Sequence, residues 1–176
     1  MDTKLNFNFP ENEKYFQELS LFIKENIFNK KKLKKKDYEK LYILIFKPFE
    51  NKKNLCFRDK IKYNMVWLDD NWKKIDFYPD YTQIQKLLNI YINKYNNEDL
   101  DLFERLYNIS LEILNKVHPF ANHNFAYTSI ILDILLIKNN LLPINIKKTF
   151  KVNNLFYPNL NIFKQIILKR YQKYTY

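Results

Sequence analysis

Apolar residues recur at helical spacing in the first third of the chain. After Pro10 and its acidic neighbours, they occupy one face at Phe16, Leu19, Phe22, Ile23 and Ile27. Proline and acids are typical of a first helical turn, so the pattern predicts a helix from about residue 10 to about residue 28. A second apolar set over 38–49 indicates another helix, which Pro48 disturbs because proline has no amide hydrogen.

The clearest helical patterns follow Pro79. Residues 79–96 form an amphipathic repeat that ends at two asparagines, and residues 98–117 form another that opens with acids. The segment 125–137, FAYTSIILDILLI, is apolar on nearly all sides, as expected of a central helix that is packed all round. A basic helix is predicted near the C-terminus, from about residue 160 to residue 171.

A β-hairpin is predicted over 63–77. Val66-Trp67-Leu68 and Ile75-Asp76-Phe77 bracket the turn-forming Asp69-Asp70-Asn71. Two strands alone are marginally stable in water, so the hairpin must pack on helices or wait for a partner strand. It is therefore our candidate edge for docking a target protein. The candidate contacts are Val66, Trp67, Leu68, Trp72 and Ile75. The alternative is that the tryptophans only cover the core.

Length and composition favour one domain. The chain has 176 residues, 47% of them hydrophobic, which is enough for one buried core. Within 1–176 we expect an N-terminal helical arm over 1–59, a core over 60–145 and a basic C-terminal helix over 146–176. Glycine is absent, so turns that need a positive φ must use Asn or Asp. The asparagine pairs at 96–97, 139–140 and 153–154 fit that role.

The positive charge of the chain is unevenly distributed. The net charge is +11, lysines are concentrated in the run Lys30–Lys36, and no acid follows Asp133. Such charge suits nucleic acid, an anionic membrane or an acidic partner. A lysine run without interleaved aromatics is, however, more typical of a solvated linker. Nucleic-acid binding through the basic surface is therefore kept as a secondary alternative.

Cysteine usage and hydropathy favour a protein of the cytoplasm. The single Cys56 has no partner for an internal disulfide and no metal-ligand spacing around it, so no metal site is predicted. The N-terminus lacks a basic region followed by an apolar run, and no segment approaches the ~20 apolar residues of a membrane span. Export into another cell and the oligomeric state are left open.

Both histidines of the chain lie in the stretch VHPFANHNFAYTS, residues 117–129. A helix that ends in His-Pro-Phe, a short loop and a following apolar helix together resemble the Fic (Fido) family, whose motif is HPFxDGNGRxxR. The match covers His118, Pro119, Phe120 and Asn124. The resemblance extends over about 60–145, where a hairpin, a proline and further helices precede the motif in the family's order. It implies a mainly α fold, a Fic-like helical bundle with a small β-hairpin flap.

The resemblance also implies a chemistry. Fic enzymes transfer a nucleoside monophosphate, usually AMP from ATP with magnesium, onto a hydroxyl side chain of a target protein. His118 would be the general base, and Asn122, His123 and Asn124 would lie in the loop that holds the phosphates. Without the resemblance, His118 is most simply a basic residue that suits the end of its helix.

This chain departs from the family motif at the charged and glycine positions. The acidic magnesium position is Asn122, the glycine positions are His123 and Phe125, and the two arginine positions are Ala126 and Ser129. A neutral amide is a poorer magnesium ligand than a carboxylate. Loss of one preorganised charge donor costs about 3–4 kcal/mol in a transition state.

Two functions from different classes follow. The favoured hypothesis is a degenerate Fic-like protein-binding module with little or no AMP-transferase activity. The alternative is an active Fic-type transferase that moves AMP or another phosphate-containing group, for which ATP and magnesium would be needed.

Overall fold

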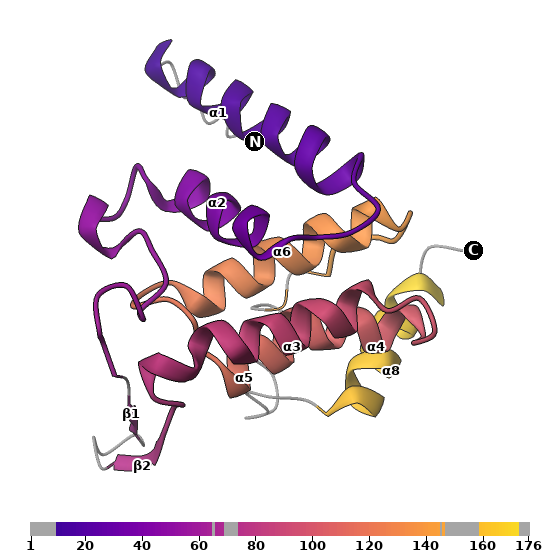
Figure 1. The fold of residues 1–176 in the computed structure, drawn as a ribbon. Helices are drawn as coiled ribbons and strands as arrows, with labels where there is room; N and C mark the ends of the chain where they lie inside the picture. Colours follow the sequence, from indigo (N-terminus) through magenta and orange to yellow (C-terminus); the bar gives the residue numbers. More distant parts are fainter. Residues whose placement is uncertain (1–9, 65, 69–73, 145, 147–158, 173–176) are drawn as a thin grey trace, which may run out of the picture.

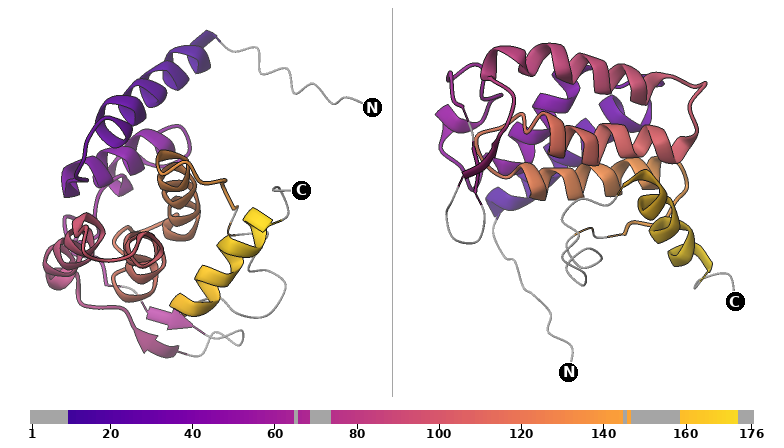
Figure 2. Two further views of the ribbon diagram at one scale, coloured as in Figure 1. Left: turned by 90° about the vertical axis from the view of Figure 1, so that its right-hand side faces the viewer. Right: turned by 90° about the horizontal axis from the view of Figure 1, so that it is seen from below.

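The computed structural model describes residues 10–64, 66–68, 74–144, 146 and 159–172. This part of the chain is mainly helical (Figure 1). Helix α6 runs through the middle, with α1 and α2 on one side and α3, α4 and α5 on the other (Figures 1 and 2). Within the described residues no helix is both long and apolar enough to cross a membrane.

The first two helices form the outer layer. Helix α1 spans Pro10–Ile23 and continues as the π-helical turn η1, Lys24–Phe28, so the helical segment matches the prediction for residues 10–28. Helix α2 spans Lys35–Phe46 and is held to α1 by a hydrogen bond from the Tyr15 hydroxyl to the Ile45 carbonyl (3.0 Å). It begins and ends about three residues earlier than predicted. Lys47, before the proline, still has helical dihedral angles (φ −53°, ψ −29°), whereas Pro48 has no amide hydrogen with which to continue the helix.

The next segment leads into two short strands. After the short 3-10 helix η2 (Lys52–Asn54), strands β1 (Val66–Leu68) and β2 (Lys74–Phe77) pair antiparallel. Val66 pairs with Phe77 and Trp67 with Asp76, and the register is irregular between Trp67 and Leu68. Both strands lie within the range predicted for the hairpin. The residues that join them, 69–73, lie outside the described residues, and the role of this sheet as a flap stays a prediction.

The remaining helices build the core around α6. A 3-10 turn, η3 (Tyr81–Gln83), leads into α3 (Ile84–Asn96). Helix α4 (Leu102–Tyr107), the π-helical turn η4 (Asn108–Glu112) and α5 (Ile113–Lys116) follow one another without a break. Helix α6 spans Asn124–Lys138, and α8 spans Leu160–Gln172.

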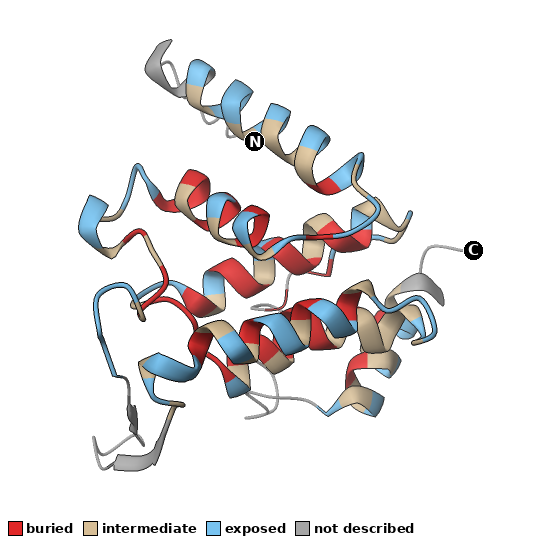
Figure 3. Ribbon diagram, in the orientation of Figure 1, coloured by how far each residue is buried: buried red, intermediate tan, exposed pale blue. Residues whose placement is uncertain are grey.

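The prediction that α6 is packed on all sides is wrong in part, because Ile130 and Ile137 are 36% and 48% exposed. Ile131, Leu132, Leu135 and Leu136 are fully buried. Buried positions of α2, α3, α5 and α6 face one another between the layers (Figure 3). One cluster of buried apolar residues extends from Ile27 in η1 to Ile167 in α8.

The chain makes left-handed turns without glycine, but asparagine supplies only one of them among the described residues. Asn140 has φ 57°, as expected for the pair at 139–140. The other three residues with positive φ are Lys62, His118 and His123. The expectation for the pair at 96–97 is wrong, because Asn97 is extended with φ −81°. The pair at 153–154 lies outside the described residues.

The run Lys30–Lys36 is also different from the solvated linker that composition favours. Leu33 in its middle is 3% exposed, and both its amide N–H and its carbonyl bond to the side chain of Asn96 (2.9 and 2.8 Å). The run is therefore held against the end of α3.

Candidate functional site

The candidate site is the loop of residues 117–123 between α5 and α6. The chain reverses here through two left-handed residues, His118 with φ 48° and His123 with φ 60°. A non-glycine residue in this conformation costs roughly 1–2 kcal/mol. The surrounding contacts must therefore hold the loop in place.

Arg58 is the main support of the loop. It is fully buried, and its guanidinium donates hydrogen bonds to four backbone carbonyls. Two of these carbonyls belong to the loop, at His118 (2.9 Å) and Val117 (3.2 Å), and the other two belong to Tyr63 (3.0 Å) and Pro79. Arginine suits this task because its planar fork carries five donors, whereas lysine has one ammonium group. The charge of Arg58 is consequently directed at the backbone.

The backbone beside Arg58 adds to this support. The Arg58 N–H donates to the Pro119 carbonyl (2.8 Å), and Phe57 and Phe120 form an isolated antiparallel bridge. The segment after η2 thus runs alongside the HPF residues and joins the loop to the start of the strand region.

Asn124 holds the loop from the other side. It is buried, its Oδ1 accepts from the Phe120 N–H (2.9 Å), and its Nδ2 donates to the Phe120 carbonyl (2.7 Å). A side-chain amide is the group that can accept and donate to one residue in this way. Asn124 is a candidate phosphate-binding residue, but both polar atoms of its side chain are bonded to Phe120 and hold the loop in place.

The His118 ring lies against the core. Its Nδ1 is 3.2 Å from the Leu114 carbonyl, and the ring stacks on Tyr78 with centroids 4.1 Å apart. Burial lowers the pKa of His118 from 6.5 to about 4, and the nearby Arg58 charge lowers it further, although the Leu114 bond acts in the opposite direction. The imidazole is therefore neutral at pH 7. A general base works best with a pKa near the working pH, so this ring is a poor proton acceptor.

Asn122 and His123 contact a carboxylate. The Asn122 amide donates to Glu50 Oε2 (2.8 Å), and His123 Nε2 lies 3.2 Å from the same oxygen. The Asn51 N–H and the side chains of Asn122 and Asn54 donate to this carboxylate, which lowers the pKa of Glu50. Glu50 is therefore ionised and places a negative charge beside the start of α6.

Two aromatic residues complete the surroundings of the loop. The His123 ring stacks on Phe46 with centroids 4.6 Å apart, and the Tyr42 hydroxyl donates to the Asn122 carbonyl (3.2 Å). Both aromatic residues come from α2. The outer layer of the fold thus closes over the loop.

Apart from Arg58, whose guanidinium is bonded to backbone carbonyls, no cationic side chain is bonded to the loop in the described part of the chain. Ala126 is exposed and Ser129 is partly buried on α6, and neither carries a charge. No lysine or arginine side chain among the described residues forms a hydrogen bond or ion pair with residues 121–126. Among the same residues, no group of three or more His, Cys, Asp or Glu side chains could hold a metal ion.

His118, Asn122 and His123 thus lie in the loop, and Asn124 is the first residue of α6. The docking candidates Val66, Trp67 and Leu68 lie on β1, and Ile75 lies on β2. Trp72 lies outside the described residues. The strands are connected to the loop through Arg58. Its guanidinium donates to the His118 carbonyl of the loop and to the Pro79 carbonyl that follows β2.

Sequence reasoning missed two residues of this site, Arg58 and Glu50. Arg58 had a usable signal, since it is one of three arginines in a chain with 30 lysines and arginines. In so lysine-rich a chain, an arginine indicates a position where a flat, forked donor is needed. Glu50 has no comparable signal, because it lies 72 residues before Asn122.

Comparison of the chain with models of known protein families finds no match, and comparison with curated protein sequences finds none.

Proposed function

We propose that this chain is a Fic-like protein-binding module with little or no AMP-transferase activity. The observation that carries the proposal is the charge around the loop: Glu50 is bonded to Asn122, and among the described lysines and arginines only Arg58 is bonded to the loop, where its guanidinium is taken up by backbone carbonyls. Nucleotide phosphates need cations or freely presented amide groups. Here they would meet a carboxylate.

The state of His118 supports the same proposal. Its ring is stacked on Tyr78, and its Nδ1 faces the Leu114 carbonyl. Phosphoryl transfer depends on positioning and on charge stabilisation, and the described residues provide neither a cationic clamp nor a strong base here.

The binding half of the proposal rests on β1 and β2. Among the described residues they form a two-stranded sheet, so each strand has an edge without a described partner strand. An extended segment of a target protein can add a third strand to such an edge through main-chain hydrogen bonds. The partner that we propose is therefore a protein with an extended segment.

We expect titration with nucleotides to show no specific binding. Calorimetric titration with ATP, CTP and GTP, with and without magnesium, should give no specific binding tighter than about 1 mM, or about −4 kcal/mol. Nucleotides labelled at the α-phosphate should transfer no label to the protein or to added protein substrates. Label transfer that disappears in His118→Ala would contradict the proposal and favour the active transferase.

We expect the strand edge to carry partner binding. Peptides selected for binding from a library of unstructured sequences should slow amide hydrogen exchange at β1 or β2. Binding should be lost when Val66 and Ile75 are replaced by proline, because proline removes the main-chain donor. The matched control replaces the exposed apolar residues Ile90 and Leu168 with threonine and glutamine and should bind as the parent does. Peptides that bind the proline variant as well as they bind the parent chain would contradict the docking hypothesis.

A further inference from the structure

The lysine bend, which we define as residues Asn29–Lys34 between η1 and α2, is held at two points. Leu33 is inserted into the core and bonded through both backbone groups to Asn96 of α3. At the other end of the bend, the Lys138 ammonium of α6 donates to the Lys30 carbonyl (2.6 Å). The bend therefore has a defined backbone path between three helices.

Lys30 faces inward and takes part in this anchoring. Its Nζ donates to Asn26 Oδ1 (2.6 Å) and pairs with the buried Asp37 carboxylate at 3.4 Å. Asp37 is thus occupied within the fold. It is the acid closest in sequence to the bend.

Four other lysines of the run point outward, whereas Lys35 is half-buried. Lys31, Lys32, Lys34 and Lys36 are exposed. Lys31 forms an ion pair with Glu98 at 3.1 Å, in which the two side chains are 75% and 55% exposed. Such exposed pairs contribute about 0–1 kcal/mol, so the pair opens readily. The other three lysines form no ion pair with a described carboxylate.

The placement of these charges does not serve helix stability. Lys34 is the N-cap of α2 and its side chain makes no capping bond, while Lys35 and Lys36 lie in the first turn. Cations at a helix N-terminus oppose the helix dipole, at a cost of roughly 0.3–1 kcal/mol each. The positive end of the α2 dipole and the lysine charges therefore add to one positive potential. These charges lie on a bend whose backbone is held in place.

From this arrangement we infer that Lys31, Lys32, Lys34 and Lys36 bind the phosphate backbone of a nucleic acid. Lysine ammonium groups contact phosphates as point charges and read no bases, so binding is independent of sequence. The bend has no outward apolar side chain for insertion into a bilayer, because Leu33 faces the core. It also lacks the amphipathic helix that membrane-surface binders use. These two features favour nucleic acid over an anionic membrane.

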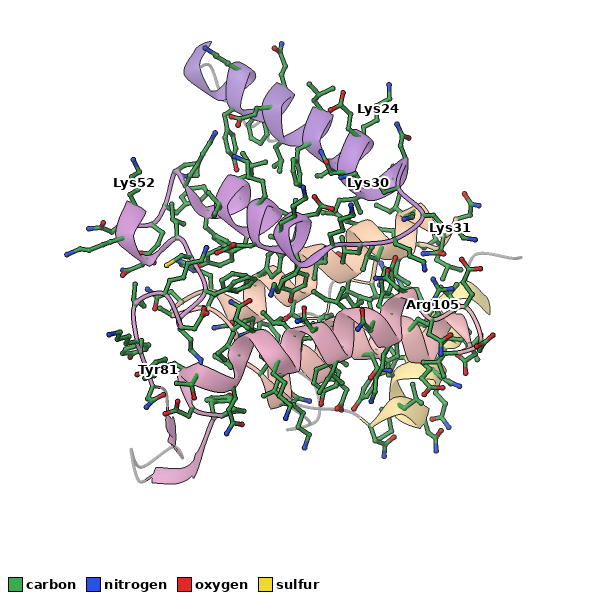
Figure 4. All side chains as sticks on the ribbon, viewed as in Figure 1. Lys24, Lys30, Lys31, Lys52, Tyr81 and Arg105 are labelled. Atoms are coloured by element: carbon green, nitrogen blue, oxygen red, sulfur yellow. The ribbon has the colours of Figure 1, made fainter. Side chains whose placement is uncertain are left out.

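The lysine bend and the candidate loop lie at opposite ends of α6. Lys138, at the last turn, contacts the bend, whereas Asn124, at the first turn, holds the loop. At 1.5 Å per residue these ends are about 20 Å apart. Lys30 and Lys31 lie at the same end of the molecule as Arg105, away from Lys52 and Tyr81 (Figure 4). The inference is therefore independent of the proposed function.

The test measures the fluorescence anisotropy of a labelled single-stranded oligonucleotide at a series of salt concentrations. The bend variant replaces Lys31, Lys32, Lys34 and Lys36 with glutamine. The control variant replaces Lys52, Lys53, Lys86 and Lys116, which are exposed elsewhere, and has the same net charge. For four phosphate contacts we expect the slope of log affinity against log salt to become shallower by about 3 in the bend variant. At about 50 mM salt its affinity should fall at least tenfold, while the control keeps the slope of the parent.

Three outcomes would overturn the inference. Equal losses in both variants would mean that only net charge matters. If the parent chain showed no salt-dependent binding, there would be no nucleic-acid binding to assign to the lysine bend. Binding to vesicles rich in phosphatidylserine but not to the oligonucleotide would assign the lysine bend to a membrane. Thermal unfolding followed by circular dichroism checks that both variants are folded, and a bend variant that unfolds is replaced by its Lys31 and Lys32 double substitution.

Discussion

Replacing Arg58 with methionine should lower the free energy of unfolding by about 3–5 kcal/mol, the largest effect that we expect from any single substitution. The side chain is fully buried, and four backbone carbonyls accept from its guanidinium. Methionine fills much of the space but donates nothing, so these buried carbonyls lose their donor. An unsatisfied buried polar group costs about 1–3 kcal/mol. Equilibrium unfolding in urea, followed by circular dichroism, measures the loss.

A second variant keeps this prediction testable if the methionine variant does not fold. Arg58→Lys retains the charge and one donor group and should lose about 2 kcal/mol, because a lysine cannot reach all four carbonyls. The matched control is Arg105→Lys. Arg105 is partly buried and donates one bond through Nε to the Tyr95 carbonyl (2.7 Å), so its loss should stay below about 1 kcal/mol. A larger loss at Arg105 than at Arg58 would refute the role assigned to Arg58.

The second large effect concerns His118 and pH. The pKa of His118 is about 4 in the folded protein, against an ordinary value of 6.5. Between these values the unfolded chain binds a proton and the folded chain does not, so stability falls as the pH falls. The full contribution of the neutral ring is present above about pH 6.5 and is lost progressively toward pH 4. From pH 7 to pH 5 the loss should be about 2 kcal/mol.

A pair of matched variants isolates this term. His118→Asn removes the titrating ring and, like histidine, tolerates the positive φ of this position, so the loss between pH 7 and pH 5 should largely disappear. His123→Asn makes the same change at the other left-handed residue and leaves the His118 contribution in place. Urea unfolding at both pH values gives the comparison. If His118→Asn keeps the full pH dependence of the parent chain, the ring is not buried in its neutral form.

Arg58 and His118 both serve the stability of the candidate loop. Arg58 has its charge directed at backbone carbonyls, and His118 has its ring packed on Tyr78. Both side chains contribute to the stability of the loop. The groups that remain at its surface, Asn122 and His123, face the Glu50 carboxylate. This distribution is our main reason to place partner binding at the strands.

The sequence by itself determined the helices and several of their ends. Helical periodicity is local, since residues three and four apart share one face whatever lies opposite. The all-round apolar pattern of 125–137 therefore identified the central helix α6, and Pro48 marked the region where α2 ends. The HPF motif likewise placed His118 at a helix end, because the helix before it and the helix after it both have clear patterns.

Only the tertiary structure decided how the polar groups are used. Arg58 reaches carbonyls about sixty residues away, Glu50 meets Asn122 across 72 residues, and Asn96 anchors Leu33 across 63. The free energy of a hydrogen bond depends on burial and on a distance of about 3 Å, neither of which periodicity contains. The lysine run shows the difference plainly: its composition indicates a solvated linker, but the insertion of Leu33 between helices makes it a defined bend.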